Sequence, residues 1–302
     1  MSELSTPGQW LAKLASDELA QLVRELVKAR KGKDSGVHKA RKALQRLRGL
    51  LRLARTTAPE WHARVDGQLR HVRRRLGRLR DAAVRAELVG SMRDNGLPAE
   101  QQAPVDTAVA ALVEAHRACW TGLDPAFWDR IDRSVARHLA AFDRWPLPEV
   151  SESAIHEALE KERRKAGLAA AKALGHVQRN RRHEMRRLLR RYAAMRKAAA
   201  YVLRQRDPGC KALVEAAREL GVEGDLWLTA TALRVSAGKE QTRALRSALE
   251  KHRRALCKKH DGELASLRRG LLSRRQAGHA ARAKSARKAE KAARAAAGGA
   301  DK

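Results

Sequence analysis

Residues 37–55 read VHKARKALQRLRGLLRLAR, and this stretch carries two rows of side chains at the spacing of an α-helix. One row is apolar and recurs every three or four positions: Val37, Ala40, Leu44, Leu47, Leu51 and Ala54. The other row has the same spacing and holds mainly cationic donors: His38, Arg41, Gln45, Arg48, Arg52 and Arg55. Because residues three and four apart share a face of a helix, one side can pack on a core while the other presents positive charge.

The composition extends this helical pattern to the whole chain. Ala, Leu and Arg dominate, and all three are strong helix formers. Ile131 and Ile155 are the only isoleucines, and aromatic residues make up 3% of the 302 residues, which leaves little material for a β-sheet. The sequence therefore predicts an all-α fold.

Prolines and glycines fall between the periodic segments, where helices are expected to end. Helices are predicted at about 9–30, 37–55, 59–95, 100–121, 125–143, 151–175, 178–205, 210–220, 225–236 and 239–272. Trp145-Pro146-Leu147-Pro148 is the best linker, so we expect a first helical-bundle repeat at 1–145 and a second at 146–275. Residues 276–302 carry Ala, Lys and Arg but almost no large apolar residue, which predicts a disordered basic tail.

Two motifs recur at almost the same offset along the chain. His38, Arg41 and Leu44 match His183, Arg186 and Leu189 at an offset of 145. The pattern L-G-x-x-x-D occurs at 76–81 and again at 220–225, at an offset of 144. A duplication of this kind predicts two four-helix bundles related by a pseudo-two-fold axis, which brings the matched basic helices to a common groove or pore.

The basic rows nominate a binding surface for a polyanion. Lys and Arg number 65 against 34 Asp and Glu, a formal net charge of +31, so nucleic acid, inorganic polyphosphate and anionic membranes are the candidate partners. Arginine suits phosphate because its planar fork donates two parallel hydrogen bonds and stays charged. The candidate polyphosphate-binding residues are His38, Arg41, Arg48, Arg52, Arg73, Arg74, Arg80, His183, Arg186, Arg187, Arg190 and Lys197.

Two further expectations concern the chemistry of this surface. Asp81 is expected to hold one of the arginines in place. Arginines around His38 and His183 should disfavour protonation of the imidazoles and bound phosphate should favour it, so binding is expected to strengthen at mildly acid pH.

The residues also resemble a known family. Val37-His38-x-x-Arg41, Arg46-Leu47-Arg48, Leu69-Arg70 and Leu76-Gly77-x-x-Arg80-Asp81 are similar to the first histidine helix and its partner in CHAD domains. His183-x-x-Arg186-Arg187 with Tyr192 resembles the second histidine helix, although Gln45 replaces a usual basic residue and Tyr192 comes two positions early. The resemblance covers about 10–272. It implies two pseudo-symmetric four-helix bundles around a basic surface, inorganic polyphosphate as the ligand, and residence on polyphosphate granules.

Other classes of function remain as alternatives. No HExxH, P-loop, GxSxG or GxGxxG motif occurs, and the nearest string to the ExExK strand that often accompanies CHAD domains, at 160–164, lies in a helical context, so we expect no catalytic site, metal site or cofactor. The main competitor is DNA binding, as in a nucleoid-associated protein that uses the 276–302 tail. A third possibility is a structural adaptor on granules, with the basic face docked and another face recruiting partners.

The remaining expectations concern the compartment. Cys119, Cys210 and Cys257 are far apart and form no CxxC pair, which predicts free thiols in a reducing compartment. The N-terminal residues lack the pattern of a signal peptide, and no stretch of about 18 apolar residues predicts a transmembrane helix. The predicted location is therefore the cytoplasm, on polyphosphate granules if the resemblance holds, with no membrane insertion.

Overall fold

A computed structural model describes residues 5–93 and 98–272 of the chain. Helices and short connections account for these residues, and no strand occurs among them, which confirms the all-α prediction. The α-helices are α1 (Pro7–Arg30), α2 (Asp34–Leu51), α3 (Pro59–Arg93), α4 (Ala99–Thr121), α5 (Phe127–Ala140), α6 (Glu152–Ala173), α7 (Arg179–Val202), α8 (Cys210–Ser236) and α9 (Arg243–Leu272). Two short 3₁₀ helices lie at Arg52–Ala54 and Phe142–Arg144. The predicted tail at 276–302 falls outside the described residues.

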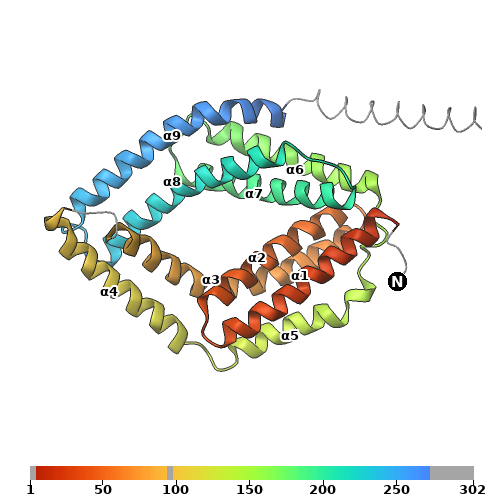
Figure 1. Ribbon diagram of the computed structural model, residues 1–302, viewed down its shortest axis with the longest axis horizontal. Helices are drawn as coiled ribbons and strands as arrows, with labels where there is room; N and C mark the ends of the chain where they lie inside the picture. The colour runs from red at the N-terminus through yellow and green to blue at the C-terminus, as the bar shows by residue number, and fades with distance from the viewer. Residues whose placement is uncertain (1–4, 94–97, 273–302) are drawn as a thin grey trace, which may run out of the picture.

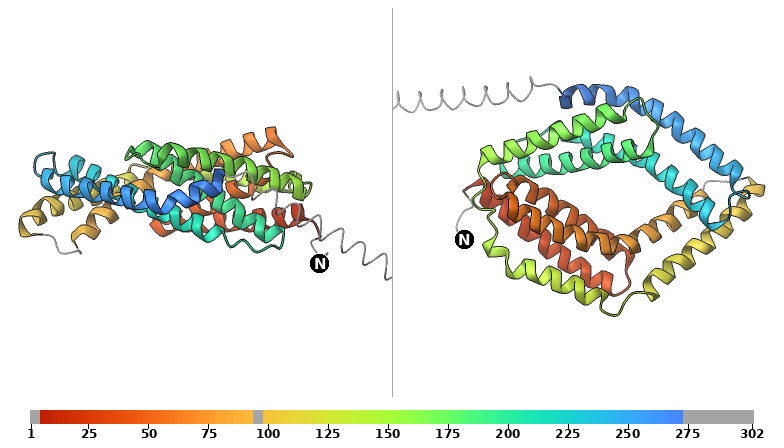
Figure 2. Two further views of the ribbon diagram at one scale, coloured as in Figure 1. Left: turned by 90° about the horizontal axis from the view of Figure 1, so that it is seen from above. Right: turned by 180° about the vertical axis from the view of Figure 1, so that it is seen from behind.

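The helices form two groups that meet along α2 and α7. Figure 1 shows α1, α2, α3 and α5 on one side and α6, α7, α8 and α9 on the other, with α4 packed on both α3 and α8 at one end. Contacts between α2 and α7, and between α3 and α8, connect the two groups. The molecule is thin when it is viewed from above (Figure 2), so the basic helices of both groups lie within one shallow layer.

The main apolar core crosses the predicted boundary at 145/146. Leu44, Leu47 and Leu51 of α2 are fully buried and pack with the leucines of α1 and α3. Met195 of α7 and Ile155 of α6 belong to the same core cluster, although they come from the second half of the chain. Burial of these residues holds α7 against α2, so the core itself brings the two matched helices together.

Several contacts recur in both halves at offsets of 144 or 145 residues. Thr6 caps the N-terminus of α1 by accepting a hydrogen bond from Gln9 N, and Ser151 does the same for α6 with Ala154 N. Arg46 of α2 donates to Glu18 of α1 at 2.5 and 2.8 Å. Arg191 of α7 donates to Glu162 of α6 at 2.8 Å, and these four residues stand at matched positions of the two halves. Each half thus fixes its basic helix by the same ion pair.

The structure corrects one prediction of a helix break. The sequence predicts separate helices at 210–220 and 225–236, but α8 runs through Gly221 and Gly224 without interruption. Arg186 of α7 occupies the space beside these glycines, with its Nη2 atom 2.8 Å from where a Cβ at Gly221 would lie. These glycines make room for the Arg186 side chain and do not form a turn. The helix-forming residues on either side keep α8 continuous. In the described residues no helix is both long and apolar enough to cross a lipid bilayer.

Candidate functional site: the basic cavity between α2 and α7

A cavity of about 220 Å³ lies where α2, α3 and α7 meet, and we call it the central cavity. Seven arginines and one histidine line it, together with Gln45, Gly49 and Ala194. The cationic residues are Arg48, Arg52, Arg73, His183, Arg186, Arg187, Arg190 and Arg191. Helices α2 and α7 approach closely at two of its lining residues, where a Cβ on Gly49 would lie 3.7 Å from the Ala194 side chain. A lining of this kind attracts a polyanion because no acidic side chain is among its residues.

One buried aspartate positions the arginines of the first half. Asp66 of α3 is 3% exposed and accepts hydrogen bonds from Arg48 at 2.8 and 3.0 Å and from Arg52 at 3.2 Å. Arg70 reaches the same carboxylate at 2.9 Å. Burial alone would raise the pKa of Asp66, but hydrogen bonds and positive charge from these arginines hold it far below its usual range. Asp66 therefore stays ionised and fixes the guanidinium groups of Arg48 and Arg52, which line the cavity.

Three arginines of the wall, Arg73, Arg186 and Arg190, crowd one another and have no hydrogen-bonded carboxylate in the described part of the chain. Arg187 and Arg191, by contrast, donate to Glu184 and Glu162. The Nε atoms of Arg73 and Arg186 are buried and have no hydrogen-bond partner in the described part of the chain. Burial, with the charge of Arg41 added, lowers the pKa of Arg73 to about 10. Burial and the charge of Arg186 also lower the pKa of Arg190. Buried cationic donors without partners are costly, and an anion placed between them would relieve that cost.

The matched motifs make the same contact in both halves. A Cβ added at Gly77 of α3 would lie 2.7 Å from the Arg41 guanidinium, and one at Gly221 of α8 would lie 2.8 Å from that of Arg186. Arg41 also forms an ion pair with Asp81 at 3.7 Å, so the expected carboxylate lies beside the arginine without a hydrogen bond to it. In each half, the glycine of the L-G-x-x-x-D motif leaves room for the guanidinium of the arginine in the histidine motif, Arg41 or Arg186. The aspartate of the motif follows four residues later.

Comparison with known proteins places these contacts in a family. The pattern that defines the CHAD domain matches residues 13–234, nearly three quarters of the sequence. The chain belongs to the CHAD domain family. The solved structures similar to it include the CHAD domain from the plant Ricinus communis, with a TM-score of 0.60 and 19% identity, covering 91% of this chain and 94% of that one. PptA from Streptomyces chartreusis gives a TM-score of 0.61 and 18% identity over 85% of this chain and 96% of that one.

At sequence identities of 18% and 19%, both comparisons show a common fold and carry no statement about function. No curated protein sequence is significantly similar to the chain. The CHAD pattern ends at residue 234, so α9 lies beyond the part of the chain that it matches.

The candidate residues from the sequence divide between this cavity and other places. The central cavity of the CHAD chain brings together Arg48, Arg52, Arg73, His183, Arg186, Arg187 and Arg190. Arg74 lines a different cavity with His71, Arg78 and Arg130, on the side of α3 that faces α4 and α5. Arg80 is held by Glu87 at 2.8 and 3.0 Å.

His38, Arg41 and Lys197 do not line the central cavity. Arg41 lies next to it, because its guanidinium lies on Gly77 and donates to the Arg73 carbonyl at 3.4 Å. Lys197 is exposed, and His38 is partly buried near Arg80 and Lys42. Their roles in binding stay predictions.

Sequence reasoning missed three residues of the wall or its support. Gln45 and Arg191 line the central cavity, and Asp66 holds Arg48 and Arg52. Gln45 belongs to the donor row of α2, and Arg191 closes the repeated histidine motif, so both carried a signal in the spacing. Asp66 carried none, because its only distinction is that three arginines converge on it in the fold.

Replacing Gly221 with alanine should separate binding from stability. The added methyl group would displace the guanidinium of Arg186, so the affinity for a polyanion should fall about tenfold, the cost of one charge-assisted contact. The unfolding free energy should stay level or rise by up to about 1 kcal/mol, because alanine favours a helix interior over glycine. Calorimetric titration and urea unfolding measure the two quantities.

Gly90→Ala is the matched control for this substitution. Gly90 also lies inside a helix, α3, and a Cβ there meets nothing within 4 Å. The control should keep wild-type affinity. Equal affinities for Gly221→Ala and wild type would show that the position of Arg186 on α8 is irrelevant to binding.

Proposed function

We propose that this CHAD chain binds inorganic polyphosphate along the central cavity and does not transform it chemically. The observation that carries the proposal is the convergence of seven arginines and His183, from both halves of the chain, on one cavity without an acidic lining residue. CHAD is a family associated with polyphosphate binding, which supports the same ligand. The lining offers donors for phosphate oxygens and no carboxylate or hydroxyl to act as a nucleophile.

Two neighbouring cavities extend the basic lining beyond a single phosphate. The α7–α8 cavity shares His183 and Arg186 with the central cavity and adds Arg179 and Arg253. The α6–α7 cavity shares Arg187 and Arg191 and adds Arg181 and two lysines, Lys165 and Lys172. Each added cavity also has one glutamate in its lining, Glu223 and Glu184, but the basic residues outnumber it. Three adjacent cavities that share basic residues fit a flexible chain of phosphates. A duplex cannot enter a cavity of this size, so DNA could contact only the rim of these cavities or another surface of the chain.

A titration of the chain lacking 276–302 tests this function against DNA binding. We expect long-chain polyphosphate to bind far more tightly than tripolyphosphate or a short DNA duplex, because it alone engages all three cavities. Affinity should fall steeply between two salt concentrations, since binding releases counterions. If the duplex competes equally well with long-chain polyphosphate after the deletion, the nucleic-acid function is favoured instead.

The same proposal predicts where the chain accumulates. A fluorescently labelled chain should gather on polyphosphate granules in cells that store them, and lose that location when polyphosphate is depleted. Retention of the same location in depleted cells would favour the adaptor alternative, in which protein partners hold the chain there.

His183 should make binding stronger at lower pH. Burial, followed by the charges of Arg179, Arg186 and Arg187, lowers the pKa of His183 in the free protein, with Glu184 opposing them. Bound phosphate would raise this pKa, so binding takes up a proton and affinity rises as the pH falls through the raised value. The gain ends below the lowered pKa of the free protein and is at most about tenfold per pH unit for one proton.

Titrations of long-chain polyphosphate between pH 5.5 and 8 measure this effect. The wild type should gain affinity toward pH 5.5, and His183→Ala should give a flatter profile. Burial and Arg80 likewise lower the pKa of His38, but that side chain does not line the central cavity, so His38→Ala should change the profile less. Identical profiles for all three proteins would refute the involvement of either histidine.

A further inference from the structure

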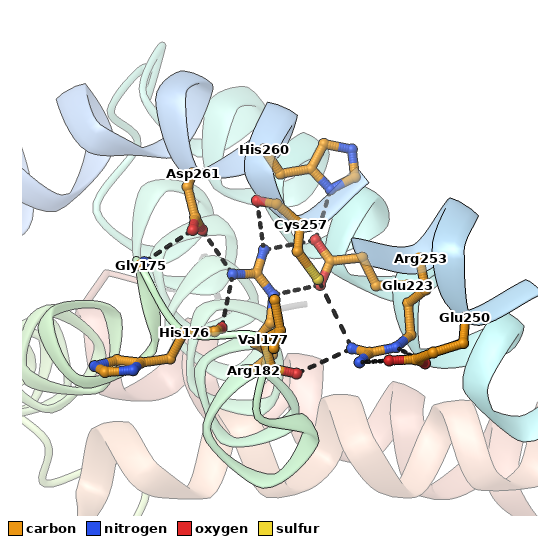
Figure 3. A network of polar contacts seen from close by, with 10 residues as sticks. All are labelled: Gly175, His176, Val177, Arg182, Glu223, Glu250, Arg253, Cys257, His260 and Asp261. Atoms are coloured by element: carbon orange, nitrogen blue, oxygen red, sulfur yellow. Dashed lines mark hydrogen bonds and ion pairs between the residues drawn. The ribbon is translucent and has the colours of Figure 1, made fainter. Parts of the chain in front are cut away.

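A buried polar network joins α9 to the basic helix α7 through α8 (Figure 3). Arg182 is 3% exposed and donates to both oxygens of Glu223, at 2.5 and 2.6 Å, and to Asp261 at 2.6 Å. The Nδ1 atom of His260 lies 2.7 Å from the same Glu223 carboxylate. His260 itself is 6% exposed. The polyphosphate site does not use this histidine, and it lies beyond the matched CHAD pattern.

The network decides which nitrogen of His260 can bind a ligand. Glu223 receives two hydrogen bonds from a buried guanidinium and is therefore a carboxylate that can only accept. The Nδ1 atom of His260 must then carry the proton and donate it to Glu223. Nε2 is thus the ring nitrogen of His260 that is left to bind a ligand, and Figure 3 shows this nitrogen turned away from Glu223.

Two carboxylates lie close to this histidine, one on α8 and one on α9. Glu219 of α8, His260 and Glu263 of α9 each place one ligand atom within 4.8 Å of the others. His260 and Glu263 are three residues apart and share one face of α9. Lys259 reaches Glu263 at 3.8 Å, beyond hydrogen-bond distance, so this partly exposed carboxylate can turn to another cation. We propose that Glu219, His260 and Glu263 bind a divalent transition-metal ion of the Zn²⁺ type.

The chemistry of the ligands selects the class of metal. An imidazole nitrogen with two carboxylate oxygens suits Zn²⁺ and its transition-metal neighbours, whereas Mg²⁺ and Ca²⁺ prefer oxygen alone. Glu223 supplies the carboxylate behind a ligating histidine that orients the ring and fixes its tautomer. The sequence offers no metal motif because Glu219 and His260 are 41 positions apart and meet only when α9 packs on α8. A bound ion would tie these helices together beside the network that holds Arg182.

Titration of the full chain with Zn²⁺, without polyphosphate, tests the site. The wild type should show one saturable site, and Glu219→Gln and Glu263→Gln should each raise the dissociation constant at least about tenfold. Both side chains reach solvent, so these substitutions should not disturb folding. Glu215→Gln is the matched control, because Glu215 is an exposed glutamate one helical turn earlier on α8, and it should bind Zn²⁺ like the wild type.

Co²⁺ in place of Zn²⁺ identifies the ligands independently. A site of one imidazole and two carboxylates should give visible d–d absorption without intense thiolate-to-metal charge transfer. Loss of that absorption in Glu219→Gln and Glu263→Gln would support the proposal. Unchanged affinity in both variants, absence of a saturable site in the wild type, or a thiolate band from a cysteine such as Cys257 would each overturn it.

Discussion

The double substitution Arg186→Ala/Arg190→Ala should weaken the binding of long-chain polyphosphate at least about 100-fold. Each charge-assisted hydrogen bond to a phosphate contributes about 1.5–3 kcal/mol. These two arginines line the central cavity, and among the described residues no carboxylate lies at hydrogen-bond distance from them. The slope of log affinity against log salt concentration should fall by about 0.7 for each lost charge, by analogy with single-stranded nucleic acids. Calorimetry at several salt concentrations gives both quantities.

A matched pair of surface arginines controls for net charge. Arg117 and Arg218 are exposed, and each forms an ion pair with a glutamate three residues earlier, outside the central cavity. The variant Arg117→Ala/Arg218→Ala loses the same two charges and should bind within a few-fold of wild type. If both double variants lose affinity equally, the diffuse charge of the chain and not the cavity drives binding.

The folded state should tolerate the loss of the two cavity arginines. Removing Arg190 and Arg186 relieves the repulsion of two neighbouring cations, and the charge of Arg186 lowers the pKa of Arg190 after burial. We therefore expect the unfolding free energy to stay level or rise in the cavity variant. A binding defect with intact stability would place these side chains in the site and not in the scaffold.

Glu223→Ala should have the largest effect on stability, about 3–5 kcal/mol of unfolding free energy. This substitution leaves the buried Arg182 guanidinium with Asp261 as its remaining carboxylate partner in the described part of the chain, and it removes the acceptor of His260. Breaking a buried ion pair costs this much because an uncompensated charge stays in the interior. Urea unfolding monitored by circular dichroism measures the change.

Two variants distinguish the buried network from ordinary surface charge. Glu215→Ala breaks an exposed ion pair and should leave the unfolding free energy close to that of the wild type. The double variant Arg182→Met/Glu223→Leu removes both charges and should be less destabilised than the sum of the single changes. A small loss in Glu223→Ala would mean that the network contributes little to the packing of α9.

The stability that Glu223 contributes should also depend on pH. Burial alone would raise the pKa of Glu223, but the hydrogen bonds and charge of Arg182 lower it below the ordinary value of a glutamate. A carboxyl group with a lowered pKa stabilises the folded state above its unfolded pKa, and this contribution is lost as the pH falls below that value. The difference between wild type and Glu223→Ala should therefore shrink under acid conditions.

The network matters for binding because of where Arg182 lies. It directly precedes His183 on α7, and Arg186 lies one helical turn further on. Glu223 and Asp261 anchor the start of α7 from α8 and α9. Helix α9, which lies beyond the end of the CHAD pattern at residue 234, thus helps to fix the basic row of α7 through the Arg182–Asp261 ion pair.

The sequence predicted the helices well wherever a periodic stripe and a breaker agreed, and poorly where they conflicted. The limits of α1, α6 and α7 agree with the expected ranges within a few residues, because Pro7 and the segment around Asp207-Pro208 coincide with changes of pattern. Gly221 and Gly224 suggested a break that α8 does not have. Their role depends on the Arg186 side chain of another helix, and no local pattern can reveal such a contact.

The candidate site shows the same division between local pattern and packing. The two donor rows on α2 and α7 were visible as residues three and four apart, but such a row covers a broad face of a helix. Arg74 and Arg73 are neighbours in the sequence, and the structure turns them to different cavities. Asp66 carried no signal because nothing near it in the chain indicates that Arg48 and Arg52 converge on it.

The sequence by itself determined that the chain is helical, that it carries two matched basic helices, and that it attracts polyanions. Those properties follow from helix propensity, periodicity and net charge, which act over a few residues or over the whole chain. The tertiary structure decided which arginines share a cavity and which face elsewhere. It also decided that His260 meets Glu219 and Glu263. These outcomes depend on how each helix is rotated about its axis as it packs, and the contacts that set the rotation join residues far apart in the chain.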